Sequence, residues 1–301
     1  MKSDKTYAAI LNEVAQSHPV RIPLYEDLQK KLGGRAVIAF YTSFRYPVTI
    51  GDDDASMLQE VLQHSDFAGG LTLLINSLGG SGLTAERIIK ICRTYSKGNF
   101  EVIVPHQAKS AATMICMGSK KILMSPTSEL GPVDPQTIIQ AEGQQQVISI
   151  AWIIKTYDEL FQQAVECKGH IEPYIQQLAK YDARQIEVFR QSLKLSEDIA
   201  IASLKTGMME QQSKQRIANR IRPFLDPLKL RTHARPIFHE QARECGLNIE
   251  PIDIQSSIWM SIWELHLRLQ YITNHQFVKI IESKEESYQV SNPFIKNGGE
   301  S

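Results

Sequence analysis

The sequence has no long apolar run. No window of its 301 residues approaches the roughly 18 consecutive apolar residues of a transmembrane helix. Residues 1–20 place charged and polar side chains where a signal peptide needs an apolar stretch. We therefore expect a cytoplasmic protein with no integral membrane segment.

An excess of charge of one sign is also missing. Lys and Arg total 33, Asp and Glu total 33, and the formal net charge is zero. A balanced chain has no general affinity for nucleic acid or for an anionic membrane, so we expect no nucleic-acid partner. With 43% hydrophobic and 22% charged residues, the composition is that of a globular protein large enough for one sizeable core.

Metal-binding and redox patterns are absent as well. The sequence contains neither CxxC nor HExxH, and its four cysteines are scattered: Cys92, Cys116, Cys167 and Cys245. His239, Glu240 and Cys245 form no recognised metal spacing. We expect reduced, mostly buried thiols, no metal and no cofactor.

The sequence between residues 71 and 124 predicts strands that alternate with helices. Apolar runs at 71–75, 100–104 and 121–124 predict buried strands, and apolar residues at helical spacing lie between them. A further run at 36–42 predicts another strand. The short connections of this β-α-β-α-β pattern favour parallel strands with right-handed crossovers.

Helices are expected through most of the remaining chain. The spacing of apolar residues predicts helices near 4–17, 21–34, 147–168, 171–180, 183–222 and 255–285. "GDDDAS", residues 51–56, has three aspartates that resemble a catalytic or metal-binding cluster. A solvated helix start is the simpler interpretation, because acidic side chains favour the first helical turn.

Two adjacent glycines end the strand at 71–75, in "INSLGGSG". Gly80-Ser-Gly82-x-x-Ala85 matches the dinucleotide fingerprint G-x-G-x-x-[GA]. That fingerprint also needs an acidic residue at the carboxyl end of the next strand. Glu101 lies at the start of that strand instead, and the pattern GxxxxGK[ST] is absent, so a nucleotide site is disfavoured.

An oxyanion hole is the other use for adjacent glycines at a strand end. Glycine permits unusual backbone dihedrals and leaves room for a substrate, so that N–H groups can face developing negative charge. The neighbouring strand is followed by "PHQAKSAATM", in which Ser110 begins a helix. Parallel strands end at one edge of a sheet, which would bring Gly79, Gly80 and the Ala111 N–H close to Ser110. Alternatively, Ser110 only caps its helix.

A family resemblance favours the first interpretation. The segments "INSLGGSG" and "PHQAKSAATMICMGSKKILMSPTSELGPVDPQ" resemble the Clp-protease/crotonase superfamily. Within it, the chain is most similar to the serine dehydrogenase proteinase family, which is related to signal peptide peptidase A. "LKTGMM" and "THARPIFHEQARECGL" resemble later segments of that family. Two departures are Leu78 in place of a proline, and alanines at 111 and 112 in place of frequent glycines.

The resemblance implies an α/β fold of Clp-protease/crotonase type, with β-β-α repeats and a mostly parallel sheet flanked by terminal helices. It covers roughly residues 35–250. We expect an N-terminal helical extension over 1–34, the catalytic core over 35–252, and a C-terminal helix and tail over 253–301. Members of the superfamily assemble from several copies, so a homo-oligomer is expected.

A serine nucleophile needs a base. Clp proteases use a histidine as this base, but the corresponding residues here, 132–136, are "PVDPQ" and contain no histidine. Proteins like signal peptide peptidase A use a lysine further downstream instead. Lys155, 45 residues after Ser110, has apolar neighbours that disfavour its ammonium form. Other candidates remain: Lys109, Lys168, Lys205, His106 and His233.

We therefore predict a serine endopeptidase that acts on a peptide or protein substrate. Ser110 would be the nucleophile and Lys155 the general base, and Gly79, Gly80 and Ala111 would form the oxyanion hole. One alternative is a weakly active or inactive peptide-binding scaffold of the same fold. Another is a crotonase-type acyl-CoA enzyme, which would use the paired N–H groups but needs no serine nucleophile.

Overall fold

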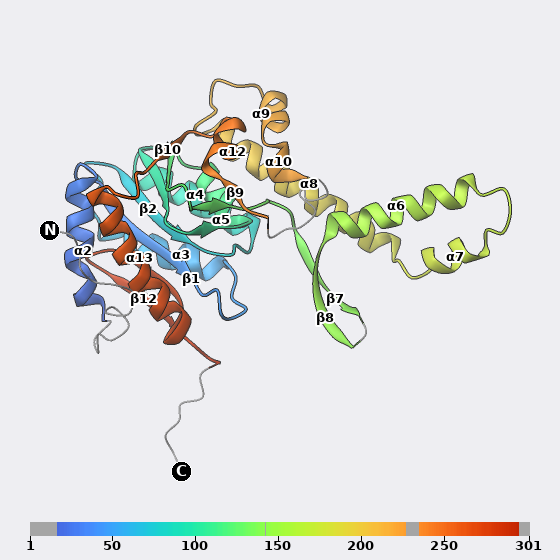
Figure 1. Ribbon diagram of the computed structural model, residues 1–301, viewed down its shortest axis with the longest axis horizontal. Coiled ribbons are helices and arrows are strands. Elements are labelled where there is room, and N and C mark those ends of the chain that lie inside the picture. The colour runs from blue at the N-terminus through green and yellow to red at the C-terminus, as the bar shows by residue number, and fades with distance from the viewer. Residues whose placement is uncertain (1–16, 142, 227–234, 295–301) are drawn as a thin grey trace, which may run out of the picture.

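The computed structural model describes residues 17–141, 143–226 and 235–294 (Figure 1). These residues form a seven-stranded central sheet in the order β10-β5-β3-β2-β1-β11-β12. Its strands are, in that order, Ile249–Pro251, Lys121–Met124, Phe100–Val104, Leu71–Asn76, Ala36–Thr42, Phe277–Glu282 and Ser287–Ser291. The first five are parallel, and β11 pairs antiparallel both with β1 and with β12. The predicted α/β fold with a mostly parallel sheet is confirmed.

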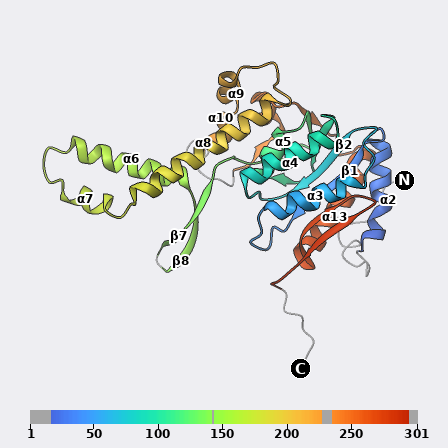
Figure 2. The ribbon, with the colours of Figure 1, turned by 180° about the vertical axis from the view of Figure 1, so that it is seen from behind.

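Helices cover both faces of this sheet. On one face lie α3 (Asp52–Gln63), α4 (Gly82–Tyr95) and α5 (Ala111–Met117), and on the other α2 (His18–Lys31) and α13 (Ser257–His275). Figure 1 shows α2 and α13 towards the viewer, and Figure 2 shows α3 and α4 from behind. Every residue of β1 and β2 is buried, as expected for parallel strands covered on both sides.

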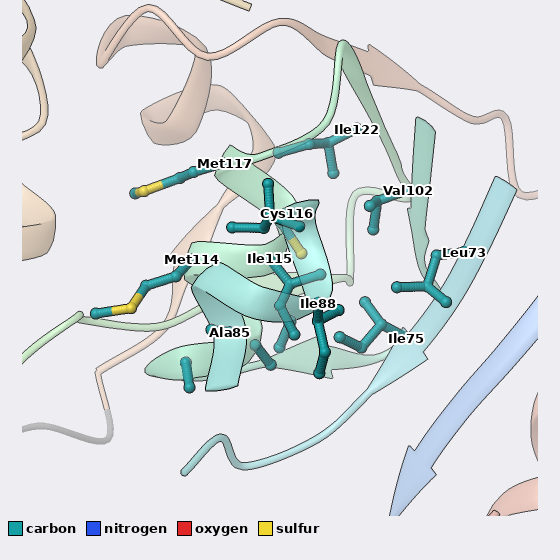
Figure 3. Close-up of a cluster of buried hydrophobic side chains, with 14 of the residues drawn as sticks. Leu73, Ile75, Ala85, Ile88, Val102, Met114, Ile115, Cys116, Met117 and Ile122 are labelled. Atoms are coloured by element: carbon teal, nitrogen blue, oxygen red, sulfur yellow. The ribbon is translucent and has the colours of Figure 1, made fainter. Parts of the chain in front are cut away.

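Helix α5 is buried along its whole length. Small residues at its start let it approach the sheet, and Ile115 and Cys116 join the larger of the two apolar clusters. Figure 3 shows Ile115 and Ile88 beside Ile75 of β2. This packing fixes the first residue of α5, and the residue before it, near the carboxyl ends of the central strands.

A long projection leaves the body of the protein after residue 135 (Figures 1 and 2). Its elements are β7 (Gln136–Ala141), β8 (Gln144–Ser149), α6 (Ile150–Glu166), α7 (Glu172–Leu178) and the first half of α8 (Ala183–Lys205). We call residues 136–190 the arm. Several of its large apolar side chains are exposed: Ile138, Val147, Phe161, Val165, Ile175 and Val188.

The β7–β8 hairpin was not expected from the sequence, which predicts a helix from 147. Gly143 has a φ of 77°, a backbone conformation typical of a tight turn between paired strands. The helix predicted over 183–222 is also wrong in extent. In the structure α8 ends at Lys205, and two short helices follow, α9 (Lys214–Arg220) and α10 (Arg222–Leu225).

The last predicted helix is wrong beyond His275. The expected span of 255–285 contains α13, but residues 277–282 form β11, and β12 follows. Both strands extend the central sheet beside β1, so the segment after 252 adds strands as well as a helix. The domain limits stay a prediction, and the helix predicted over 4–17 lies, except for residue 17, outside the described residues.

A small second sheet lies at the carboxyl edge of the main one. It consists of β4 (Gln107–Ala108), β6 (Glu129–Leu130) and β9 (Ile237–Phe238), and α12 (His239–Glu244) follows. Among the described residues, none of the helices combines the length and the apolar character needed to cross a membrane.

Candidate active site

Ser110 has a strained backbone. Its φ of 49° and ψ of −119° make it, with Lys97, one of two non-glycine residues with positive φ in the described chain. Strain of this kind is common at functional sites, and nucleophilic serines are often held on such a turn between strand and helix. Ser110 makes no side-chain capping bond to α5, so the capping interpretation gains no support. Ser110 is partly exposed.

Gly79 lies directly against Ser110. Its φ is 97°, and a Cβ at this position would lie 2.8 Å from Ser110 Cβ and 2.9 Å from the Ala111 nitrogen. A side chain is therefore excluded both by the backbone conformation and by the neighbouring loop. The structure thus brings the glycine turn and the serine turn together at one edge of the sheet.

Two N–H groups at this meeting point have no acceptor among the described residues: those of Gly80 and Ala111. The Gly79 N–H is occupied, since it donates to Ser77 Oγ at 3.1 Å. Ser77 Oγ accepts in turn from Thr42 Oγ1 at 2.8 Å. Gly80 and Ala111 are therefore the better candidates for oxyanion donors, and Gly79 provides the close contact with Ser110.

The segment "ELGPVDPQ" holds the serine turn from the other side. The Ser110 N–H donates to the Pro132 carbonyl at 3.1 Å. Thr113 Oγ1 donates to the Ala108 carbonyl at 2.8 Å and accepts from the Gly131 N–H at 3.2 Å. The Ser110 turn and "ELGPVDPQ", both parts of the family resemblance, are thus in direct contact.

Lys109 is close to Ser110 in sequence, but its amine is already engaged. Nζ lies 2.8 Å from Glu129 Oε1 and 3.4 Å from the Leu130 carbonyl. Burial lowers the pKa of Lys109, and the hydrogen bond and charge of Glu129 oppose that effect. Burial favours the neutral amine, whereas Glu129 favours the charged one. The short contact with Glu129 is that of an ion pair.

His106 points towards the α13 face of the sheet. Its ring lies 6.2 Å from Phe44 and 5.8 Å from His266 of α13, measured between centroids. Burial lowers the pKa of His106. It also lowers the pKa of His266 to about 3, helped by the charge of His106. Because α5 covers the opposite face, this ring is directed away from the helix that Ser110 begins.

Lys155 lies on α6, in the arm, and no contact with Ser110 is found in the described chain. Its side chain is 41% exposed, with Nζ 3.5 Å from Glu159 Oε1 and 5.2 Å from the centre of the Trp152 ring. Both views of the ribbon show α6 well apart from α5. The arm therefore presents Lys155 at the surface of a single copy.

Two other candidate bases, Lys168 and Lys205, show no contact with Ser110 among the described residues. Lys168 is exposed beyond the end of α6, and Lys205 donates to the Glu210 carbonyl at 2.5 Å. His233 lies outside the described residues. Within the described ranges, no group of three or more His, Cys, Asp or Glu is placed to hold a metal ion, and the absence of a metal stays a prediction.

The structure also shows the surroundings of Glu101, considered above for a nucleotide site, and of the aspartates in "GDDDAS". Glu101, at the start of β3, forms ion pairs with Arg35 at 3.3 Å and with Lys121 at 3.5 Å, and no interaction with Gly80 is found among the described residues. Asp52 of the "GDDDAS" segment is exposed as expected, but for Asp54 the expectation was wrong because this carboxylate is completely buried.

The fold and the serine turn define a ClpP-like protein: a mostly parallel sheet whose edge carries a glycine turn against a strained serine. The chain belongs to the family of ClpP-like SDH-type serine proteinases, whose model matches residues 38–292. The family resemblance inferred from the sequence is thereby confirmed.

Two archaeal proteins are similar to the chain. The uncharacterized protein MJ0137 of Methanocaldococcus jannaschii is 30% identical over 180 residues, 60% of this chain and 53% of that protein. The uncharacterized protein MJ1495 of the same organism is 32% identical over 89 residues, 30% of each chain. The chain thus spans about half of the first relative and less of the second.

Proposed function

We propose that the protein is a serine peptidase with Ser110 as nucleophile. Ser110 Oγ attacks the carbonyl carbon of a peptide bond, and the Gly80 and Ala111 N–H groups stabilise the resulting oxyanion. The amine leaves with the proton that the base took from Ser110, and water then hydrolyses the acyl-enzyme. The strained backbone of Ser110, whose side chain caps no helix, carries this proposal.

Lys155 is our proposed general base, supplied within a homo-oligomer. A neutral amine is the form that can accept the serine proton, and covering the arm with another copy would desolvate Lys155 and favour that form. The exposed apolar side chains of the arm support such an assembly, since they remain unpartnered in a single copy. Lys109 is the second candidate, because it is buried next to Ser110.

The crotonase alternative explains less of the site. A thioester enolate requires the paired N–H groups but no strained serine, whereas the geometry holds a hydroxyl beside them. The scaffold alternative needs a peptide to bind beside the serine turn but predicts no turnover. Hydrolysis therefore separates the alternatives, since only the peptidase proposal predicts a product that depends on the Ser110 hydroxyl.

The experiment is hydrolysis of a fluorogenic peptide mixture by wild type, Ser110→Ala and Ser213→Ala. Ser213 is a matched control because it begins α9 and its Oγ does accept a capping bond, from the Arg216 N–H at 3.3 Å. We expect Ser110→Ala to abolish hydrolysis, and Ser213→Ala to keep it while losing about 1 kcal/mol of stability. Equal hydrolysis by wild type and Ser110→Ala would rule out the proposed nucleophile.

A further inference from the structure

Asp54 is a buried carboxylate with fixed partners near the glycine turn. It is 0% exposed, although it belongs to the first turn of a surface helix. Oδ2 accepts from the Gly51 N–H at 2.7 Å. Lys279 Nζ donates to Oδ1 at 2.9 Å and to Oδ2 at 2.7 Å. Capping of α3 needs only the bond from the Gly51 N–H. The two bonds from Lys279 on β11 therefore require another explanation.

The peptide unit held by Asp54 also holds the glycine turn. Ile50 C=O and Gly51 N–H are the two ends of one peptide group. The N–H end binds Asp54, and the C=O end accepts from the Ser81 N–H at 2.9 Å. Since the peptide group is planar and rigid, fixing one end fixes the direction of the other.

Ile50 also sets the direction of the Gly80 N–H. The Ile50 N–H donates to the Gly79 carbonyl at 2.8 Å. Gly79 C=O and Gly80 N–H belong to one trans peptide and point in opposite directions. Holding this carbonyl towards Ile50 therefore turns the Gly80 N–H away from Ile50.

The contact at Gly80 is too close for any adjustment. A Cβ on Gly80 would overlap the backbone nitrogen and oxygen of Ile50. Ile50 is itself buried and packs in the larger apolar cluster. The backbone of residues 50 and 51 thus forms a clamp on Gly79–Ser81. Asp54 binds this clamp directly at the Gly51 N–H, and the ion pair with Lys279 fixes Asp54 in turn.

We propose that Asp54, held by Lys279, is a positioning residue for the oxyanion hole. This inference rests on the proposed function. The carboxylate fixes the 50–51 peptide and so anchors residue 50, whose own N–H holds the Gly79 carbonyl and thereby directs the Gly80 N–H. A donor displaced from the oxyanion loses part of its stabilising effect on the transition state, while substrate contacts away from the oxyanion are unchanged.

The test is the rate at which a fluorophosphonate probe phosphonylates Ser110, separated into kinact and KI. The variants are Asp54→Asn, which keeps an acceptor for Gly51 but loses the charge, and Lys279→Met, which leaves the carboxylate without its partner. The matched control is Asp52→Asn. Asp52 lies in the same helical turn, but its partner is Arg87, at 2.6 Å on the surface.

We expect kinact to fall about tenfold or more in Asp54→Asn and Lys279→Met, with KI within about twofold of wild type. Asp52→Asn should match wild type in both constants. A thermal melt of each variant reports whether it is folded, and a merely structural role would lower the folded fraction without changing the kinact of the folded protein.

Several outcomes overturn the inference. It is wrong if either folded variant keeps the wild-type kinact, if Asp52→Asn falls equally, or if neither variant folds, because the pair would then serve stability alone. Failure of the proposed function looks different. In that case, wild type itself is not labelled at Ser110, before any variant is compared.

Discussion

Gly79 and Ser110 are in direct contact at the carboxyl edge of the sheet, so close that a Cβ on Gly79 would lie 2.8 Å from Ser110 Cβ. The two residues come from different turns, 31 positions apart in the chain. Each has a positive φ, 97° for Gly79 and 49° for Ser110. A strained serine that faces a glycine turn defines the site more sharply than either residue type alone.

Replacing Gly79 with alanine should therefore disable the site. The new methyl group meets Ser110 and the Ala111 nitrogen, and the positive φ adds strain of about 1–3 kcal/mol. We expect loss of labelling by a fluorophosphonate together with a lower free energy of unfolding, measured by urea denaturation.

The control for this change is Gly98→Ala. Gly98 has a similar φ of 80°, but no atom would lie within 4 Å of its added Cβ. This variant should lose about 1–2 kcal/mol of stability from backbone strain and keep its labelling. If Gly79→Ala were labelled as fast as Gly98→Ala, the close packing of the two turns would have no role in reactivity.

Lys155→Ala should abolish peptide hydrolysis with little change in stability. The side chain is exposed, and its contact with Glu159 is a surface ion pair worth less than about 1 kcal/mol. Lys168→Ala, a second exposed lysine at the end of α6, is the control and should remain active. Hydrolysis assays and thermal melts of both variants test this prediction.

Co-expression of Ser110→Ala with Lys155→Ala tests whether the arm serves another copy. Each variant alone lacks one part of the site. If Lys155 reaches the Ser110 of a neighbouring subunit, mixed assemblies contain some complete sites and recover part of the activity. Activity of Lys155→Ala alone, with loss in Lys109→Met, would identify Lys109 as the base instead.

Acid should destabilise the protein through His266. Its pKa is lowered to about 3 by burial, against about 6.5 in an unfolded chain. Between these pH values the unfolded state binds a proton that the folded state excludes. The stability from this group is thus complete above about pH 6.5 and decreases towards pH 3, by up to about 1.4 kcal/mol per pH unit.

The variant His266→Gln should flatten this dependence. Glutamine keeps a polar group for the hydroxyl of Tyr41, which lies 3.1 Å from His266 Nδ1, but does not titrate. We expect a smaller slope of unfolding free energy against pH between 4 and 6, measured by urea denaturation at several pH values. His64→Gln, at the exposed end of α3, is the control. An unchanged slope in His266→Gln would contradict the assignment.

The sequence predicted the elements around the site because local signals and tertiary packing agree there. The strand at 71–76 and the helix that follows it are bounded by Gly79, Gly80 and Gly98, and each forms as predicted. The position of Ser110 beside the glycine turn followed from the rule that parallel strands end at one edge. Its backbone strain has no sequence signal, because serine is an ordinary residue at a helix start.

The sequence failed where pairing with distant strands decides the structure. The spacing of apolar residues predicts a helix through residues 277–282, but pairing with the distant strand β1 makes them strand β11. The role of Asp54 was missed for the same reason, since its partner Lys279 lies on that strand. A run of acidic residues at a helix start gives no indication that one of them is buried.

The site of covalent labelling decides whether Ser110 is the nucleophile. Wild-type protein is treated with a fluorophosphonate probe, digested, and examined by tandem mass spectrometry, with Ser110→Ala in parallel. If Ser110 is the nucleophile, we expect one modified peptide, with the phosphonyl group on Ser110, and no labelling of the variant. Labelling at another serine, or unchanged labelling of Ser110→Ala, would contradict the central claim that this hydroxyl is the nucleophile.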